Sequence, residues 1–308
     1  MESRILTKNN SAVCGVPLWL YNTLPDSVKD SLGGVNNEKL KCLSEIRLRT
    51  NGICTLTSYG ENIALGDRNN FVTLPEKEID SFLHKVCGGS VYSYESSIAQ
   101  GFITVNGVRL GISGDITLKN GTITGFSKIR SVNIRIPRHI DGCADKLLCH
   151  INTTPYPKLG GILIASAPGV GKTTVLRELA LKLSSVSDKL YRVCVIDERC
   201  EIYLPEVFKN SSADIYLRIP KNKGIEFASR VMNPEFIIFD EIGSDTDVNS
   251  IISAHFGGSV FISSVHASNP SEILQKNKIR ILCDEGVFSH IFFLERTEAG
   301  IKNSLHKI

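Results

Sequence analysis

The fold is decided by the stretch Ser166-Ala167-Pro168-Gly169-Val170-Gly171-Lys172-Thr173, which Thr174 continues. A short apolar run, Ile162–Ala165, comes directly before it, and a helical pattern, Thr173–Leu183, follows it. A glycine-rich loop between a strand and a helix is the context that a Walker A phosphate loop requires. The alternative is a glycine-rich turn that contains Lys-Thr by chance, and the order of strand, loop and helix disfavours it. The sequence therefore predicts a binding site for ATP at residues 166–174.

Each residue type in this loop has a physical role in binding phosphate. Gly169 and Gly171 permit backbone conformations in which N–H groups point toward phosphate oxygens. The following helix adds its positive N-terminal end. We expect Lys172 to reach the β- and γ-phosphates and the Thr173 hydroxyl to ligate Mg²⁺. One position departs from the motif, because Ser166 stands where the motif has its first glycine.

Two apolar runs downstream each end in an acidic pair. Phe236–Phe239 is followed by Asp240 and Glu241, and Val193–Ile196 is followed by Asp197 and Glu198. We expect Asp240 to hold the Mg²⁺ shell and Glu241 to activate water as the general base, with Glu198 assisting at the metal or the water. Either pair alone fits a solvated strand end equally well, but two such pairs after a Walker A loop favour a hydrolytic site.

Histidine and arginine supply further candidates. His266 follows the apolar run Val260–Ser263 and is placed to sense the γ-phosphate, although a lone histidine in a loop is more often structural. P-loop ATPases often need an arginine at the γ-phosphate, supplied by the same chain or by a neighbouring subunit. Arg135 is our first candidate, and each candidate also fits an ordinary surface arginine. The other candidates are Arg130, Arg199 and Arg230.

The second half of the chain predicts an α/β fold. Short apolar runs alternate with helical patterns, which is typical of a parallel sheet with helices on both faces. Together with the phosphate loop this predicts a RecA-like P-loop domain over residues 151–308. The stretch His150–Gly161 contains two prolines and two glycines without periodicity, and we interpret it as the linker between domains.

The first half predicts a smaller α+β domain over residues 1–150. Apolar residues in Glu76–Val86 are spaced as in an amphipathic helix. Asn106-Gly107 and Asn120-Gly121 lie between alternating runs and predict two hairpins within Gly101–Gly125. Val132–Ile136 also alternates and predicts one more strand, and Ser44–Thr50 predicts another.

Composition excludes several classes of protein. The 308 residues include 35 basic and 32 acidic ones, so the net charge of +3 argues against a dedicated nucleic-acid-binding role. With 42% hydrophobic residues the chain can bury a core. No apolar run reaches the ~18 residues of a membrane-spanning helix, and the polar start does not resemble a signal peptide. The nine cysteines form no CxxC pair, which favours reduced thiols in the cytoplasm over a zinc site.

The order of the motifs resembles the Walker A, Asp box, Walker B and His box of type II/IV secretion and pilus-retraction ATPases. Further segments resemble the stage III sporulation protein AA family, and the resemblance runs from about Leu43 to His266. These segments are Glu45–Arg49, Gln100–Thr104, Asn133–Ile136, Gly142–Ala144, Asp197–Ile202 and Asp240–Gly243. The run Ser244–Asp247 departs from the pattern, since relatives usually carry Arg or Glu there.

The resemblance implies more than composition and spacing do. It implies a secretion-type ATPase that acts as a homo-hexamer in the mother cell of a spore-forming bacterium. It also implies peripheral association with the membrane and a membrane-embedded sporulation channel component as partner. His266 takes the His-box role by the same resemblance.

Two other functions compete with a secretion motor. A RecA-like fold also serves nucleic-acid-stimulated ATPases, and stimulation by single-stranded DNA or RNA would favour that reading. The chain could instead be an assembly platform that binds nucleotide without hydrolysing it. The acidic pairs argue against the platform, and a Glu241→Gln protein that still functions in cells would argue for it.

Overall fold

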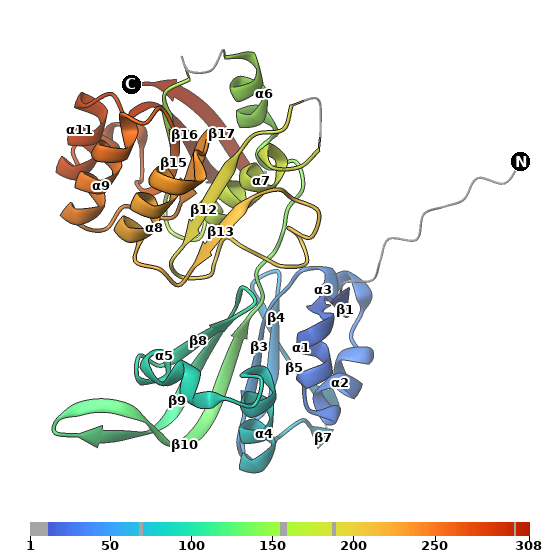
Figure 1. The fold of residues 1–308 in the computed structure, drawn as a ribbon. Helices are drawn as coiled ribbons and strands as arrows, with labels where there is room; N and C mark the ends of the chain where they lie inside the picture. The colour runs from blue at the N-terminus through green and yellow to red at the C-terminus, as the bar shows by residue number, and fades with distance from the viewer. Residues whose placement is uncertain (1–11, 68–69, 155–158, 187–188, 299) are drawn as a thin grey trace, which may run out of the picture. The chain divides into compact units, whose positions relative to one another are not determined.

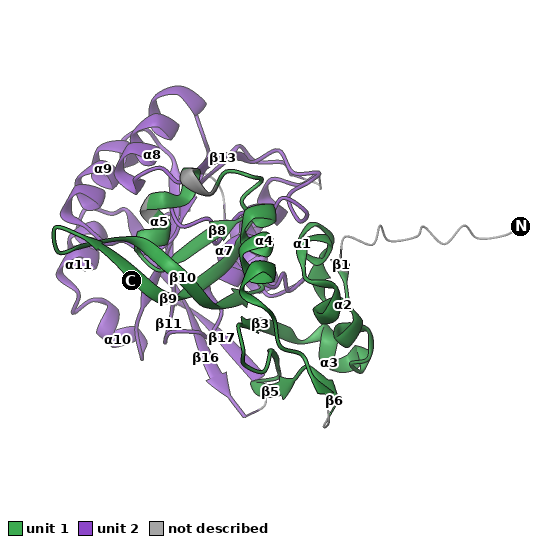
Figure 2. Cartoon of the chain, turned by 90° about the horizontal axis from the view of Figure 1, so that it is seen from below, with its two compact units in different colours: residues 1–137 green, residues 138–308 purple. Residues whose placement is uncertain are grey.

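Two separate sheets organise the chain. The computed structural model describes residues 12–67, 70–154, 159–186, 189–298 and 300–308. It divides into two compact units, Met1–Pro137 and Arg138–Ile308 (Figures 1 and 2). The polar start of the chain and residues 155–158 of the predicted linker lie outside the described residues.

The second unit is built on a seven-stranded sheet with the order β13-β12-β14-β15-β11-β16-β17. The first six strands in this order are parallel, and β17 pairs antiparallel with β16. The central strands are buried along their whole length, which explains their continuous apolar runs. The strands are β11 (Gly161–Ser166), β12 (Val193–Asp197), β13 (Asp214–Leu217), β14 (Phe236–Phe239), β15 (Val260–His266), β16 (Phe288–Thr297) and β17 (Gly300–Lys307).

Helices cover both faces of this sheet, as the alternating pattern predicts. On one face α6 (Asp145–Thr153) and α7 (Lys172–Leu183) bury their apolar side chains. On the other face lie α8 (Lys221–Phe227), α9 (Asp245–His255) and α11 (Asn277–Asp284). A π-helical turn, η2 (Ala228–Met232), and the short α10 (Pro270–Ile273) complete the unit.

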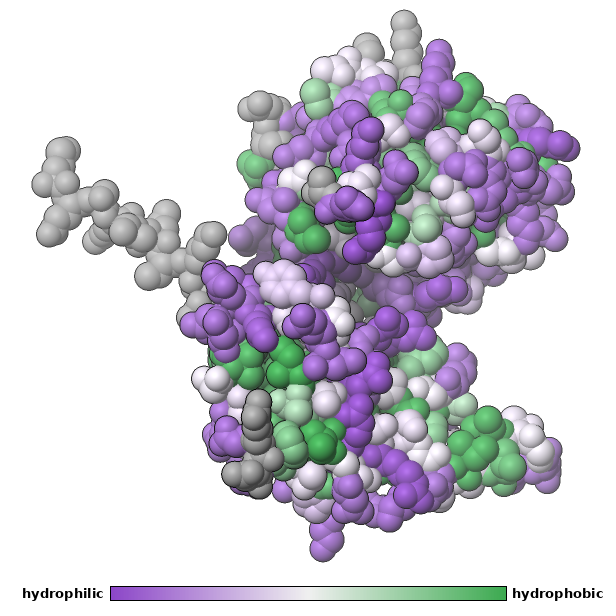
Figure 3. Space-filling view, turned by 180° about the vertical axis from the view of Figure 1, so that it is seen from behind, coloured by the Kyte–Doolittle hydropathy of each residue, from purple (hydrophilic) through white to green (hydrophobic). Residues whose placement is uncertain are grey.

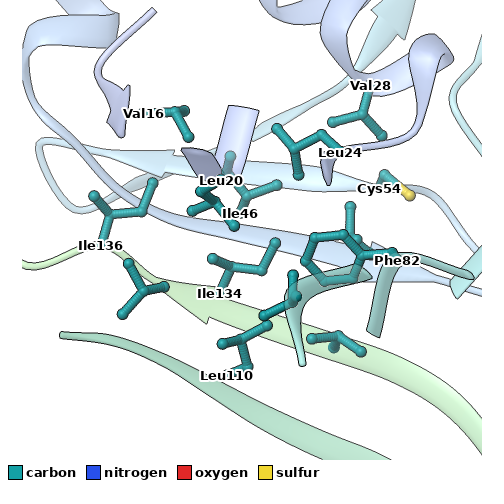
Figure 4. Close-up of a cluster of buried hydrophobic side chains, with 14 of the residues drawn as sticks. Val16, Leu20, Leu24, Val28, Ile46, Cys54, Phe82, Leu110, Ile134 and Ile136 are labelled. Carbon is teal, nitrogen blue, oxygen red and sulfur yellow. The ribbon is translucent and has the colours of Figure 1, made fainter. Parts of the chain in front are cut away.

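The first unit is an antiparallel sheet with the strand order β5-β4-β3-β10-β9-β8. Its core joins side chains of the sheet, such as Ile46, Leu110 and Ile134, to Leu20 and Phe82 from two helices (Figure 4). The strands of this sheet are β3 (Leu43–Arg49), β4 (Thr55–Ser58), β5 (Glu61–Ala64), β8 (Phe102–Val105), β9 (Val108–Lys119) and β10 (Thr122–Arg135). The helical segments are α1 (Leu18–Thr23), α2 (Asp26–Gly33), α3 (Asn37–Lys41), α4 (Glu76–Val86), η1 (Val91–Tyr94) and α5 (Glu95–Ala99). Two small strand pairs are β1 (Ala12–Val13) with β2 (Val16–Pro17), and β6 (Gly66–Asp67) with β7 (Asn70–Phe71).

Local sequence signals located several of these elements well. The predicted helix Glu76–Val86 is α4, and both Asn-Gly turns connect antiparallel strands. Asn106 and Asn120 have φ angles of 47° and 53°, which asparagine tolerates in a hairpin turn. The strand predicted at Val132–Ile136 is present up to Arg135, but it is the last part of β10, which forms one long hairpin with β9 and also pairs with β3. The tip of this hairpin exposes Ile116, Leu118 and Ile123, and it forms the apolar patch at the lower right of Figure 3.

The sequence predicts the boundary between the two domains after residue 150, and the structure places it earlier. The chain divides at Pro137 and Arg138, so α6 belongs to the second unit. Ala144, Leu147 and Ile151 pack into the core beneath α7, which is why the break comes before the helix. Within the part of the chain that the structure describes, no helix is both long and apolar enough to cross a membrane.

Candidate nucleotide-binding site

The predicted phosphate loop connects β11 to α7. Gly169 and Gly171 have φ angles of 74° and 125°, a region that favours glycine, so both are needed for the loop to turn. Val170 is buried in the core and anchors the loop from below. The α7 helix begins at Lys172, and the N–H groups of its first turn, including those of Thr173 and Thr174, have no partner within the helix. The loop therefore has the backbone features of an anion site.

Lys172 is held at the centre of a polar network. Its ammonium lies 3.3 Å from the carbonyl oxygens of Ser166 and Ala167 and 3.4 Å from the Ser166 hydroxyl. It also lies 2.8 Å from His266 Nδ1. Burial lowers the pKa of Lys172, and the carboxylates of Glu241 and Asp240 oppose that shift. The unusual Ser166 thus contributes a further oxygen close to the lysine.

His266 connects the phosphate-loop lysine to the predicted general base. An ammonium only donates hydrogen bonds, so Nδ1 of His266 must accept from Lys172. The ring proton is then on Nε2, which lies 3.3 Å from Glu241 Oε2. These partners assign the tautomer. Three residues that the sequence singled out, Lys172, His266 and Glu241, are therefore in contact at the carboxyl ends of β11, β15 and β14, where open parallel sheets bind ligands.

Two serines that the sequence analysis missed fix Asp240. The Ser264 hydroxyl lies 2.7 Å from Asp240 Oδ1, and the Ser263 hydroxyl donates to the Asp240 main-chain oxygen over 2.9 Å. Both serines are fully buried in β15, next to β14. The sequence signal that could have identified them is the presence of polar residues within an otherwise apolar strand.

The residues predicted for magnesium suit that ion chemically. Thr173 and Asp240 are partly buried and offer a hydroxyl and a carboxylate oxygen, which are the ligands that Mg²⁺ prefers. Ser264 orients the carboxylate of Asp240 by binding one of its two oxygens.

The two residues of the second acidic pair lie in different surroundings. Asp197 is fully buried and accepts hydrogen bonds from the N–H groups of Glu201, Ile202 and Tyr203, so it shapes the turn after β12. Burial raises its pKa, and these three donors oppose the rise. Glu198 is more exposed, and its carboxylate lies 4.0 Å from the ammonium of Lys221. Lys221 also donates to the main-chain oxygen of Glu241, a contact for which the sequence gave no motif.

The predicted arginines lie in different surroundings. Arg135 ends β10 in the first unit, where its guanidinium pairs with Glu45 at 3.1 Å. Arg130 pairs with Asp115, and Arg230 pairs with Glu226. Arg199 is exposed after β12. An arginine that the sequence analysis did not consider, Arg296 of β16, donates to the main-chain oxygen of Gly169 over 3.2 Å and thus contacts the phosphate loop.

Comparison with known proteins identifies relatives along most of the chain. A family model described as "Sporulation stage III, protein AA" matches residues 20–303. Stage III sporulation protein AA of Bacillus subtilis (strain 168) is 29% identical over 288 residues, which cover 91% of each chain. The Holliday junction branch migration ATPase PINA of Sulfolobus acidocaldarius is 28% identical over 139 residues, 44% of this chain and 26% of that protein.

Solved structures show the same fold at low identity. The Legionella pneumophila ATPase DotB has a TM-score of 0.57 at 16% identity and covers 86% of this chain and 77% of its own. The pilus retraction motor PilT, solved with bound ADP, has a TM-score of 0.61 at 15% identity and covers 88% of this chain and 80% of its own. The prediction of a RecA-like fold with a preceding domain is thereby confirmed.

Proposed function

The chain belongs to the sporulation stage III, protein AA family, and from that membership we propose that it is an ATP-hydrolysing motor of the secretion type. Its ATP turnover would energise a transmembrane channel complex during endospore formation. The observation that carries the proposal is the contact chain from Lys172 through His266 to Glu241. It joins the residue that binds phosphate to the residue that activates water, which a site for binding alone does not need.

In this mechanism the residues of the phosphate loop bind the nucleotide, and residues at the ends of the strands assist the hydrolysis. Lys172 and the N–H groups of residues 169–174 hold the phosphates of ATP. Thr173 and Asp240 would hold Mg²⁺, and the bound ion would supply positive charge beside the phosphates. Glu241 takes a proton from the attacking water, and Glu198 assists it. His266 accepts a hydrogen bond from Lys172 at Nδ1 and holds its Nε2 3.3 Å from Glu241 Oε2, so a displacement of the lysine by phosphate would change the surroundings of the base.

The same family membership supports a proposal for the assembly. We propose a homo-hexamer in the mother-cell cytoplasm that associates peripherally with the membrane through a membrane-embedded sporulation channel component. An arginine from the neighbouring subunit, with Arg135 as the first candidate, would complete each site. Nucleic acid is not the expected partner, because the net charge is only +3.

ATP turnover against protein concentration tests the proposal. Phosphate release is measured while light scattering reports the mass of the particle, with Lys172→Ala as the control that lacks the main positive charge at the phosphates. We expect turnover per chain to rise steeply as rings form and Lys172→Ala to be inactive. Wild-type turnover in Lys172→Ala would contradict the proposed nucleotide-binding site. A monomer whose turnover per chain does not change with protein concentration would contradict the proposed ring.

A second candidate function is a nucleic-acid-stimulated ATPase. It is favoured by the similarity of 44% of this chain to a protein named for Holliday junction branch migration. Adding single-stranded DNA, RNA or a four-way DNA junction to the same turnover assay separates the two functions. Stimulation by more than about tenfold would favour the second candidate, and unchanged turnover would favour the first.

A further inference from the structure

Lys221 is a buried cation between the two acidic strand ends. Its side chain is only 8% exposed, whereas that of Lys223, two residues further along α8, is 58% exposed. Among the described residues, Lys172 and Lys221 are the lysines that are buried. A long charged side chain ordinarily keeps its head in water, so the burial of Lys221 needs a reason.

The contacts of the ammonium supply that reason. Its Nζ donates to the main-chain oxygen of Glu241, in the segment after β14. It also lies 4.0 Å from Glu198 Oε2, in the segment after β12. An ammonium has three donors and no acceptor, so one group can hold a carbonyl and a carboxylate at once. Lys221 thereby bridges the two segments that carry the proposed base and its assistant.

Packing fixes the place from which Lys221 reaches these groups. Lys221 is the first residue of α8, and α8 lies against β12. At Gly224 a Cβ atom would come within 2.5 Å of Ile196 Cγ2, so the helix approaches the strand more closely than any other residue type would allow. The helix that begins at Lys221 is therefore held against β12 at Ile196, the residue before the acidic pair.

We propose that Lys221 is a positioning residue for hydrolysis. It holds the backbone of Glu241 so that the carboxylate meets His266, and its ammonium faces the carboxylate of Glu198. It contacts neither phosphate nor water in this role. The inference rests on the proposed ATPase function and deepens it.

Matched variants on α8 test this role. Lys221→Met removes the charge and all donors at similar length, Lys221→Gln keeps an N–H donor without the charge, and Lys221→Arg keeps the charge. Lys223→Met is the control on the exposed face of the same helix. We expect Lys221→Met to lower kcat by about 10–100-fold, with KM and the affinity for a fluorescent ATP analogue within about threefold of wild type. Lys221→Arg should recover part of the loss, and Lys223→Met should match wild type.

The outcomes separate the inference from the function on which it rests. A folded Lys221→Met or Lys221→Gln protein with wild-type kcat overturns the inference while the ATPase function stands. Equal losses of kcat and ATP affinity, without recovery in Lys221→Arg, also overturn it, because they indicate a merely structural lysine. If Lys221→Met does not fold, Lys221→Gln decides. Wild-type protein that binds ATP without hydrolysing it overturns both proposals.

Discussion

The protonation of Lys172 depends on a balance between burial and two carboxylates. Burial lowers its pKa despite Glu241 and Asp240, so between the lowered value and the ordinary one of about 10.4 the unfolded chain binds more protons than the folded chain. The free energy of unfolding therefore rises with pH across that window. We expect the stability of wild type relative to Lys172→Met to increase as the pH rises toward the ordinary lysine pKa of about 10.4. Urea unfolding at several pH values measures this, with Lys223→Met as the exposed control. A constant difference for Lys172→Met would contradict the prediction.

At the level of single residues, motifs predicted the centre of the site but not its supports. Lys172, Asp240 and Glu241 stand in short patterns whose chemistry is local, and they lie together at the strand ends. Ser264 of β15 and Lys221 of α8 lie outside the residues that the motifs singled out, and their roles depend on which elements are neighbours in space. Such contacts cannot be predicted from spacing along one chain.

The close contact between α8 and β12 allows a test of whether the packing of these elements positions the candidate site. A Cβ at Gly224 would lie 2.5 Å from Ile196 Cγ2 and 3.1 Å from Ile219 Cγ2, so Gly224→Ala must push the helix outward. We expect a loss of about 1–3 kcal/mol in the free energy of unfolding and lower turnover, since Lys221 moves with the helix. Gly33→Ala in α2 is the control, because its Cβ meets nothing within 4 Å. Equal stabilities of the two variants would show that α8 can shift without cost.

The run Ser244–Asp247, which departs from the family pattern, begins α9. Ser244 Oγ accepts from Asp247 N over 3.1 Å, and Asp247 Oδ2 accepts from Ser244 N over 2.9 Å, which forms a capping box. Ser244→Ala should therefore cost about 1 kcal/mol in urea unfolding. Ser253→Ala, at an exposed position of the same helix, serves as the comparison and should be near neutral. A neutral Ser244→Ala would mean that the cap is not needed.

Elements with strong periodicity were predictable and exposed or short ones were not. The central strands and α4 follow patterns set by burial. Edge strands β13 and β17 are partly exposed and mixed in composition, so no apolar run marks them. Between β15 and β16 the chain forms two helices, α10 and α11, and the apolar spacing does not reveal the break between them.

At the scale of the whole molecule, α7 ties the phosphate loop to the segment that follows the first unit. Arg177 donates to the carbonyl oxygen of Arg138 over 2.6 Å, and Glu178 accepts from Gly142 N over 3.0 Å. Lys182 pairs with Asp141 at 2.9 Å. These partners come directly after Pro137, the last residue of the first unit. A movement of α7 during turnover would therefore pull on the connection between the units.

Mixed rings test whether the first unit completes a neighbour's site. Arg135 is 63% exposed on its side chain, so its pair with Glu45 leaves the guanidinium open to exchange. Arg135→Ala keeps Lys172, and Lys172→Ala keeps Arg135. In an equal mixture of the two variants, one interface in four joins a subunit that has Lys172 to a neighbour that has Arg135. If the arginine acts across a closed ring, turnover should therefore recover to about a quarter of wild type.

The turnover of each variant alone is the baseline against which the turnover of the mixture is compared. Each variant alone should be nearly inactive, so activity that appears only on mixing must come from paired subunits. Arg130→Ala is the control and should stay active alone, since the Arg130 guanidinium donates two hydrogen bonds of 2.9 Å to Asp115, whereas Arg135 donates one of 3.1 Å to Glu45. An Arg135→Ala protein that is active by itself, or a mixture that shows only the sum of its parts, would exclude Arg135 as the residue acting between subunits. Recovery would require a site shared between neighbouring subunits, because neither variant holds a complete set of charges.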